Sequence, residues 1–126
     1  MSGKVNFFVC DRCGNVAGLF LSKGGTLACC GENMRELKPN TVEASTEKHI
    51  PVVEQNGSRV KVKVGSVAHP MTEEHLIDFI YVCTESGGQH AMLKAGGAPE
   101  AEFSVDGKVT AVYAYCNLHG MWQAAL

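Results

Sequence analysis

The fold is decided by residues 50–64, which read IPVVEQNGSRVKVKV. In the second half of this stretch, three valines alternate with charged residues, as in a strand with one face in the core and the other in water. The Asn56-Gly57 pair between the two halves favours a type I′ turn, because that turn needs positive φ angles. The stretch therefore predicts a β-hairpin with strands over residues 50–55 and 59–64.

The rest of the chain, as far as the C-terminus, repeats this pattern of short apolar runs and glycine-containing turns. Runs rich in β-branched and aromatic residues are typical of strands, and glycine, proline and asparagine separate them. The expected strands cover residues 76–84, 89–94, 101–105, 108–116 and 121–126. The turns are expected at Gly87-Gly88, at residues 96–99 and at Asp106-Gly107. Six or seven short strands joined by such turns predict an antiparallel β-sandwich.

The N-terminal part of the chain has a different character. Residues 1–36 hold only short apolar runs, many turn-forming residues and four of the six cysteines. A segment of fewer than ~40 residues usually needs a metal, a disulfide or a partner to fold, because its own core is too small. Proline and the residue before it favour extended backbone, so Lys38-Pro39-Asn40 is expected to be a linker. We therefore predict two domains, residues 1–37 and residues 38–126.

Four cysteines follow the pattern C-x2-C-x15-C-C and are Cys10, Cys13, Cys29 and Cys30. Four thiolates form a closed tetrahedral site for zinc or iron. Adjacent side chains on extended backbone point to opposite faces, so Cys29 and Cys30 can reach one ion only from a bent backbone. The spacing by itself leaves open an iron centre, a structural zinc site of the zinc-ribbon kind and a vicinal disulfide.

Four histidines and one cysteine in the C-terminal part form a second candidate site. Each is expected where a loop meets a strand, and loops gather at the ends of a β-sandwich. Four imidazoles and one thiolate exceed the tetrahedral set that zinc favours and leave one octahedral position vacant. Such a set suits iron with an open position for chemistry. Its members are His49, His69, His75, Cys116 and His119.

Composition and charge exclude several classes of function. A formal net charge of −2 gives no electrostatic basis for binding nucleic acid. No apolar run approaches the ~20 residues that span a membrane, and the N-terminus lacks the apolar stretch of a signal peptide. A cytoplasmic location is therefore expected. Thiols stay reduced there, so the six cysteines indicate metal binding rather than disulfides.

Three further residues are assigned no function. His90 falls inside an expected strand without a partner and is expected to lie on the surface. Cys83 is expected to pack as a small buried hydrophobe. Trp122 stands close to the second ligand group in the sequence, and packing is the expected role of its ring.

The two groups of motifs together resemble the desulfoferrodoxins, a family of two-iron superoxide reductases. The resemblance rests on Cys10-x2-Cys13 with Cys29-Cys30, on Glu47-Lys48-His49, on Ala68-His69-Pro70 with His75, and on Cys116-Asn117-x-His119-Gly120. It covers the whole chain, and both ligand groups occur in the family's order.

The resemblance implies a small rubredoxin- or desulforedoxin-like Fe(Cys)4 domain followed by an immunoglobulin-like β-sandwich with an Fe(His)4Cys centre. In that centre, the equatorial ligands would be His49, His69, His75 and His119, and the axial ligand would be Cys116. The implied activity is the one-electron reduction of superoxide to hydrogen peroxide. Rubredoxin or a similar protein would be the electron donor, and the protein would be a cytoplasmic homodimer.

Glu47 and Lys48 directly precede His49, and the resemblance implies that both lie on a loop over the open position of the iron. Lys48 would attract the superoxide anion, because a local cation raises the rate of encounter. Glu47 would occupy the vacant position in the oxidised resting state. Without the resemblance, the two residues would be an ordinary solvated pair of charges.

Two other classes of function compete with this interpretation. Cys116, His119 and Met121 could form the thiolate–imidazole–thioether set of a blue-copper electron carrier, but three further histidines would then be superfluous. A zinc-ribbon interaction module with a partner-binding sandwich would explain the clustered cysteines and leave the histidines unexplained. Metal content separates the three classes, as two iron ions per chain, copper, or zinc alone.

Overall fold

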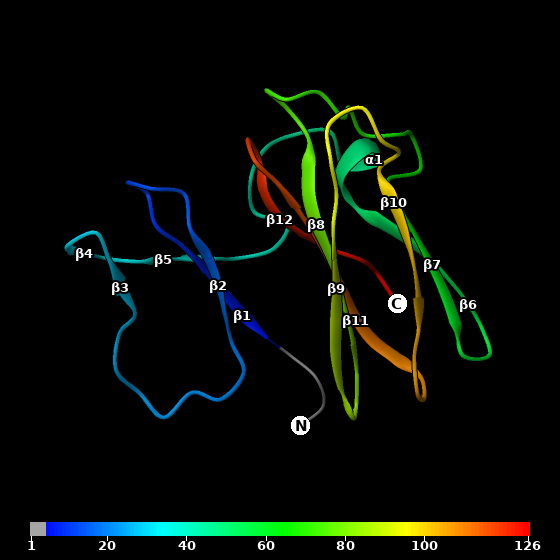
Figure 1. Ribbon diagram of the computed structural model, residues 1–126, viewed down its shortest axis with the longest axis horizontal. Helices are drawn as coiled ribbons and strands as arrows, with labels where there is room; N and C mark the ends of the chain where they lie inside the picture. Colours follow the sequence, from blue (N-terminus) through cyan, green and yellow to red (C-terminus); the bar gives the residue numbers. More distant parts are fainter. Residues whose placement is uncertain (1–4) are drawn as a thin grey trace. The chain divides into compact units, whose positions relative to one another are not determined.

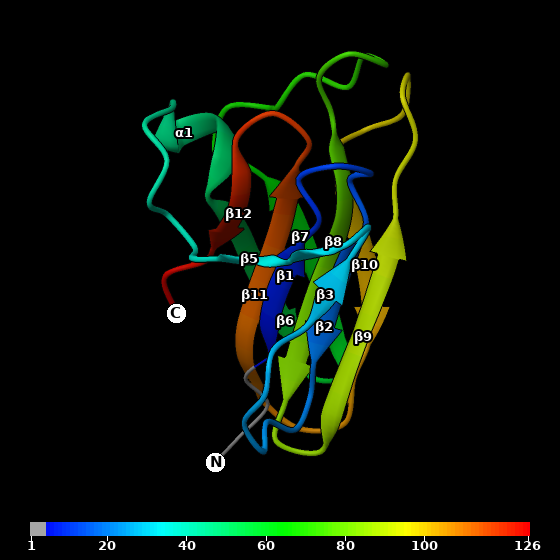
Figure 2. The same cartoon turned by 90° about the vertical axis from the view of Figure 1, so that its left-hand side faces the viewer.

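The computed structural model of the protein describes residues 5–126, which divide into two compact units, residues 5–38 and residues 39–126. Both units are built from antiparallel strands (Figures 1 and 2). A single turn of helix, α1 (Thr46–His49), is the only helix within residues 5–126. The prediction of an all-β protein is confirmed.

The smaller unit has five short strands. They are β1 (Asn6–Val9), β2 (Val16–Leu19), β3 (Ala28–Cys29), β4 (Glu32–Asn33) and β5 (Arg35–Leu37). β1 pairs with β2 on one side and β5 on the other, while β3 and β4 form a separate hairpin. The buried apolar side chains described in this unit are Val5, Phe7, Val9 and Leu37, together with Cys10. So small a core leaves the four cysteines as the means of holding the unit together.

The larger unit is a sandwich of two antiparallel sheets. The first has the order β10 (Glu100–Ser104), β7 (Arg59–Val64), β6 (Pro51–Asn56). The second has the order β12 (Gly120–Gln123), β11 (Val109–Cys116), β8 (Ile77–Thr84), β9 (Gly87–Met92). Sheets of three and four strands are the composition of an immunoglobulin-like sandwich.

Alternate residues of β7 face the second sheet, as their alternation with charged residues predicts. Val60, Val62 and Val64 are all buried. They belong to one apolar core with side chains of the second sheet such as Ile80 and Val112. This core sets the register of the hairpin, because a slip of one residue would turn the valines to the solvent.

The hairpin of β6 and β7 has a different turn from the one predicted. Asn56 pairs with Arg59 at the end of the ladder, so the turn residues are Gly57 and Ser58, one position later than expected. Gly57 has a φ of 64°, which glycine adopts without a steric penalty. One glycine supplies the positive φ that this turn uses, so Asn56 stays in the strand.

The Gly87-Gly88 pair does not break the sheet, contrary to the prediction. β9 begins at Gly87, and the turn lies before it, at Glu85-Ser86. Gly88 suits its place inside the strand because the Tyr81 ring lies where a Cβ atom would be. An aromatic ring from a neighbouring strand thus covers the glycine, a known way of keeping glycine in a sheet.

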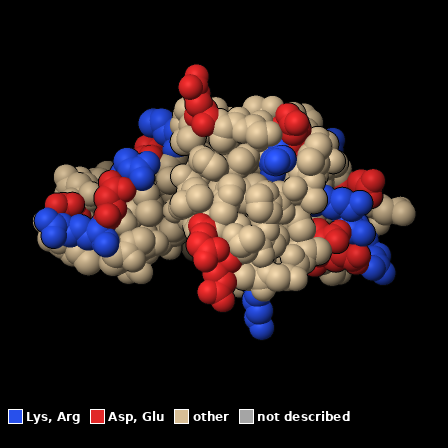
Figure 3. Space-filling view, turned by 90° about the horizontal axis from the view of Figure 1, so that it is seen from above, with Lys and Arg blue, Asp and Glu red and all other residues tan. Residues whose placement is uncertain are grey.

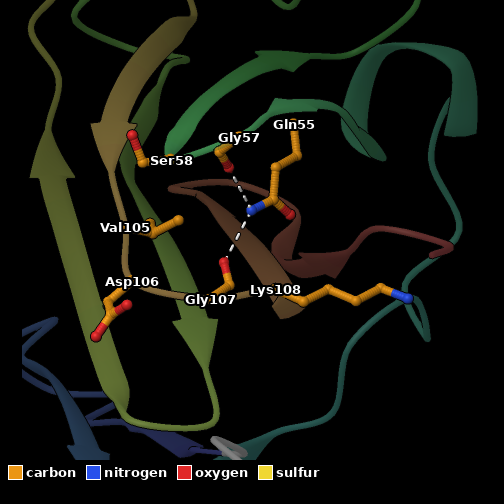
Figure 4. Close-up of a pocket in the computed structure, with 7 residues that line it drawn as sticks. All are labelled: Gln55, Gly57, Ser58, Val105, Asp106, Gly107 and Lys108. Carbon is orange, nitrogen blue, oxygen red and sulfur yellow. Dashed lines mark hydrogen bonds between the residues drawn. The ribbon is translucent and has the colours of Figure 1, made fainter.

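One side-chain amide fixes the end of the sandwich away from α1. Gln55 Nε2 donates to the carbonyl oxygens of Gly57 and Gly107, at 3.0 and 2.9 Å, and Gln55 Oε1 accepts the N–H of Val109 at 3.1 Å. Figure 4 shows this amide between the two carbonyl groups. Two of these hydrogen bonds, to Gly107 and from Val109, join the β6–β7 hairpin to the β10–β11 turn, and the third lies within the hairpin.

We expect Val62→Ala to lower the free energy of unfolding by about 2 kcal/mol, because it removes fully buried methyl groups and leaves a cavity. Val62 is 0% exposed. Chemical denaturation followed by the fluorescence of Trp122, the one tryptophan in the chain, measures the change. The control is Val52→Ala on β6, where the side chain is 41% exposed and the expected loss is about 0.5 kcal/mol. Equal losses would contradict this assignment of the core face.

Candidate metal centres

The four cysteines of the smaller unit, Cys10, Cys13, Cys29 and Cys30, come together around one point. Their sulfur atoms lie within 4.8 Å of one another. Cys13 Sγ is 3.7 Å from Cys29 Sγ, which is 3.9 Å from Cys30 Sγ. Four sulfurs bonded at about 2.3 Å to a tetrahedral ion would be about 3.8 Å apart. The cluster therefore has the size of a closed tetrahedral metal site.

Two tight turns bring these sulfur atoms together. In the first, Gly14 has a φ of 84° and donates its N–H to the Cys10 carbonyl at 2.9 Å. In the second, Cys30 and Gly31 have φ angles of 54° and 77° between the paired strands β3 and β4. Two successive left-handed residues characterise a type I′ turn. The bent backbone predicted for adjacent Cys29 and Cys30 is present.

Backbone N–H groups favour a thiolate in the cysteine cluster, and a thiolate binds a cation. The N–H groups of Cys13 and Arg12 lower the pKa of Cys10 to about 7. Hydrogen bonding among the crowded sulfurs, first with Cys13, raises the pKa of Cys30 to about 12. One thiolate therefore forms readily, whereas further negative charge in the cluster requires a positive ion.

Three segments of the larger unit lie at one end of the sandwich (Figures 1 and 2), and they carry four histidines and a cysteine. His49 ends α1, His69 and His75 lie between β7 and β8, and Cys116 and His119 flank the β11–β12 turn. Donor atoms of His49, His75, Cys116 and His119 lie within 4.8 Å of one another. His69 Nε2 is 3.2 Å from His49 Nε2. All five residues predicted for this site are brought together.

The four imidazole rings form a cycle. Neighbouring rings in the order His49, His69, His75, His119 have centroids between 4.6 and 5.1 Å apart and cross at 78° to 84°. His49 and His75, on opposite sides of the cycle, are 6.2 Å apart. Cys116 Sγ lies 3.8 Å from His119 Nδ1. Four nitrogens in a cycle with one sulfur beside them are the donor set of a five-coordinate ion with one position open.

Backbone carbonyls decide which nitrogen of two rings faces the site. The carbonyl oxygen of Ser45 lies 2.7 Å from His49 Nδ1, and that of Pro70 lies 2.7 Å from His69 Nδ1. A carbonyl oxygen only accepts, so each Nδ1 carries the proton and each Nε2 carries a lone pair. The two Nε2 atoms are 3.2 Å apart, and neither can donate to the other. The two lone pairs repel each other, and a cation bound between them would remove this repulsion.

The ring nitrogens of His75 and His119 that face the site are also placed to bind a cation. His75 Nε2 is buried and has no hydrogen-bond partner among residues 5–126. His119 Nδ1 lies 3.2 Å from His49 Nε2. Neighbouring nitrogens bonded at about 2.1 Å to an octahedral ion are about 3 Å apart. The residues therefore fit a bound ion, and their mixture of imidazole and thiolate suits iron.

Burial sets the charge state of these donors. His49, His69 and Cys116 are buried. Burial lowers the pKa of His69 to about 4 and also lowers the pKa of His49 and of His75, so these imidazoles are neutral at pH 7 and can bind a metal. Burial raises the pKa of the Cys116 thiol, which is therefore protonated in the metal-free protein.

Glu47 and Lys48 lie on α1 with exposed side chains. Three effects lower the pKa of His75. Burial has the largest effect, followed by repulsion from His119 and then by repulsion from the Lys48 charge. The Lys48 ammonium therefore lies within electrostatic range of the site. The main-chain carbonyl of Glu47 accepts the N–H of Val67 at 2.9 Å, which ties α1 to the β7–β8 loop.

Gly65 allows this close approach of α1 to the loop, a role that the sequence analysis missed. A Cβ atom at Gly65 would lie 2.6 Å from the Glu47 carbonyl oxygen and 2.9 Å from that of Ile50. A side chain there would push α1 away, together with His49 at its end. A glycine between a strand and a loop is the only sequence signal of this role.

Trp122 does more than the packing expected from the sequence. Its buried ring lies 4.8 Å from the His49 ring, and its Nε1–H donates to the His119 carbonyl at 3.1 Å. Trp122 therefore supports two members of the histidine cycle from β12. The sequence shows an aromatic residue near the ligands, but not which main-chain carbonyl it bonds.

His90 and Cys83 lie outside both ligand groups, as predicted. Cys83 is buried, and this burial raises its pKa to about 11. His90 is exposed on β9, where its ring stacks on Tyr81 with centroids 6.5 Å apart. All six cysteines are free thiols, so the vicinal disulfide between Cys29 and Cys30 is absent.

The surface near the second site is mostly uncharged. The view onto the end of the sandwich that carries α1 shows a wide uncharged area, with acidic and basic side chains in small groups around it and one basic group within it (Figure 3). This face has no extended basic patch of the kind that binds nucleic acid. The single short helix within residues 5–126 falls far below the length and apolarity of a membrane span.

Comparison with known proteins gives one consistent result. Residues 41–125 match the family model described as desulfoferrodoxin, and residues 2–37 match the desulfoferrodoxin N-terminal domain. The desulfoferrodoxin of Nitratidesulfovibrio vulgaris is 42% identical, over 98% of both chains. The desulfoferrodoxin homolog of Archaeoglobus fulgidus is 41% identical, over 98% of this chain and 99% of its own.

Solved structures give the same result. The superoxide reductase from Treponema pallidum is 42% identical and superposes with a TM-score of 0.82, over 97% of this chain and 99% of its own. A one-iron superoxide reductase from Giardia intestinalis is 32% identical, with a TM-score of 0.54, over 64% of this chain and 97% of its own.

We expect binding of Fe²⁺ at the histidine–cysteine site to release one proton, from Cys116. Between pH 7 and 8.5, burial keeps this thiol protonated while His49, His69 and His75 are already neutral. The logarithm of the affinity should therefore rise by about one per pH unit. Anaerobic competition against a chelator measures it in a Cys13→Ser background. A pH-independent affinity, or the same slope in Cys116→Ala, would refute the assignment.

Proposed function

This chain belongs to the desulfoferrodoxin family, and we propose that it is a superoxide reductase, which adds one electron and two protons to superoxide to give hydrogen peroxide. The activity is supported by two solved superoxide reductases that are 42% and 32% identical to it. The chain carries two iron ions, as Fe(Cys)4 in the smaller unit and Fe(His)4Cys in the larger. The carriers and interaction modules considered as alternatives do not account for both donor sets.

The observation that carries this proposal is the convergence of four imidazole nitrogens and the Cys116 sulfur at one end of the sandwich. Five donors leave one octahedral position for the substrate, whereas four thiolates close the first site. Bound ferrous iron supplies the electron. The Cys116 thiolate favours the release of that electron, because a thiolate ligand increases the electron density at a metal.

Each predicted site residue receives a role in this proposal. Residues 1–37 form the domain that holds the first ion, through Cys10, Cys13, Cys29 and Cys30. Residues 38–126 form the domain that holds the second ion, through His49, His69, His75, His119 and Cys116. The distances between the donor atoms of each set support this division.

Lys48 and Glu47 are proposed to act at different steps. The exposed ammonium of Lys48 lies within electrostatic range of His75, so it would attract superoxide and hold the water that supplies protons. The carboxylate of Glu47 would act after reduction, by approaching the open position in the oxidised protein.

The electron donor and the cellular setting follow from the family resemblance. Rubredoxin or a similar small electron carrier would re-reduce the protein, and the working form would be a homodimer in the cytoplasm. Five of the six cysteines belong to the two donor sets and must stay reduced to bind metal, which supports a reducing compartment.

The two centres should be separable by mutation, because each donor set lies within one unit. Cys13→Ser should abolish the absorption of the Fe(Cys)4 centre and leave the reaction of pre-reduced protein with superoxide nearly unchanged. His75→Ala should do the reverse. Metal analysis, absorption spectra and pulse radiolysis provide the measurements. Loss of the superoxide reaction in Cys13→Ser with the second iron still bound would disprove this division of labour.

Lys48→Ala should slow the bimolecular reaction with superoxide by about tenfold, because it removes an exposed charge that attracts the anion. The dependence on ionic strength should also weaken, since salt screens exposed charges over ~10 Å at 0.1 M. Lys48→Arg is the matched control and should retain both. Pulse radiolysis at several salt concentrations measures the effect.

Glu47→Ala should leave this encounter almost unchanged and alter the spectrum of the oxidised centre. If both variants slow the reaction equally, or if neither does, Lys48 and Glu47 have no separate roles and are ordinary solvated residues of the helix.

A further inference from the structure

We propose that Asn117 is a positioning residue, which holds the loop carrying His75 against the turn carrying Cys116 and His119. The inference rests on the proposed role of these three residues as ligands of the second ion. It concerns the geometry of the site and is independent of which substrate the site reduces.

The contacts of Asn117 reach both sides of His75. Asn117 Oδ1 accepts the N–H of Leu76 at 3.0 Å, and Asn117 Nδ2 donates to the carbonyl of Glu74 at 3.0 Å. The main-chain N–H of Asn117 donates to the Leu76 carbonyl at 3.2 Å. One residue therefore binds the main chain immediately before and immediately after His75.

His75 needs this support because its ring is not anchored. The rings of His49 and His69 are each held by a main-chain carbonyl at Nδ1. No hydrogen bond of the His75 ring is found within residues 5–126, and its Nε2 is buried without a partner. The direction of the His75 ring therefore depends on how its own main chain is held.

Thr72 also holds the main chain of His75, but only within the same loop. The Thr72 N–H donates to the His75 carbonyl at 3.0 Å, and Thr72 Oγ1 accepts the His75 N–H at 3.1 Å. These bonds close a local turn. Asn117 differs because it belongs to another segment of the chain and directly follows Cys116.

The position of Asn117 couples two donors of different chemistry. Its main chain continues from Cys116, the one sulfur donor, and its side chain fixes the loop of one nitrogen donor. If the amide is lost, the main-chain bond from Asn117 to Leu76 and the pairing of Cys116 with Ile77 remain, but the main chain before His75 loses its bond to the Cys116 turn. Loss of such supporting contacts typically weakens metal binding by about 10- to 100-fold. A resulting shift of His75 would change the symmetry of the donors around the ion.

The test uses the full-length, iron-loaded protein with Asn117→Ala. We expect iron to be lost to a chelator from the second site about 10- to 100-fold faster than from the wild type. We also expect a changed electron paramagnetic resonance spectrum of the oxidised centre. Asn117→Asp keeps the acceptor for Leu76 but places an oxygen against the Glu74 carbonyl. It should shift both readouts in the same direction by a smaller amount, and it decides the matter if Asn117→Ala does not fold.

Gln55→Ala is the matched control, because Gln55 is also a side-chain amide that binds main-chain groups of two segments, at the other end of the sandwich. It should lower the unfolding midpoint without changing the spectrum or the rate of iron loss. Wild-type spectra and iron loss in the Asn117 variants would overturn the proposal, as would equal changes in Gln55→Ala. Failure of the proposed activity is detected separately, as absence of superoxide reduction in the wild type.

Discussion

Two nitrogen lone pairs held face to face are the constraint on which the larger unit depends. The carbonyls of Ser45 and Pro70 keep the protons of His49 and His69 on Nδ1, so two Nε2 acceptors face each other at 3.2 Å. A buried polar group without a partner costs about 1–3 kcal/mol. A cation removes that cost when it binds. The two main-chain carbonyls therefore destabilise the metal-free site relative to the metal-bound site, and this difference increases the affinity for a metal.

The sandwich serves this constraint by delivering three segments to one end. The core valines of β7 fix its register, and β7 ends where Gly65 admits α1 against the following loop. β11 ends at Cys116, whose side chain belongs to the same apolar core. The sulfur donor is therefore part of the core, and its burial excludes the water that would otherwise compete for the thiolate. Cys116 therefore both packs in the core and provides a ligand atom.

Much of this arrangement could be predicted from the sequence, and the part that could not has a common cause. The ligand spacings identified both donor sets, and the bent backbone at Cys29 and Cys30 followed from their adjacency. The residues that orient the donors were missed, because every residue has a carbonyl and only the fold decides which one meets a ring. The same reason applies to the hairpin turn, where pairing of Asn56 with Arg59 overrode the local preference of Asn56-Gly57.

The two centres differ in exposure as well as in donors, and this difference suits a division between storing an electron and delivering it. Cys13 and Cys30 are exposed, so the closed cysteine site reaches the surface of its unit. At the second site, Cys116 is buried, while Lys48 on the neighbouring α1 is exposed. If the proposed activity is correct, Cys116 would hold the ion from the core side, and its thiolate would increase the electron density available for the reduction of superoxide.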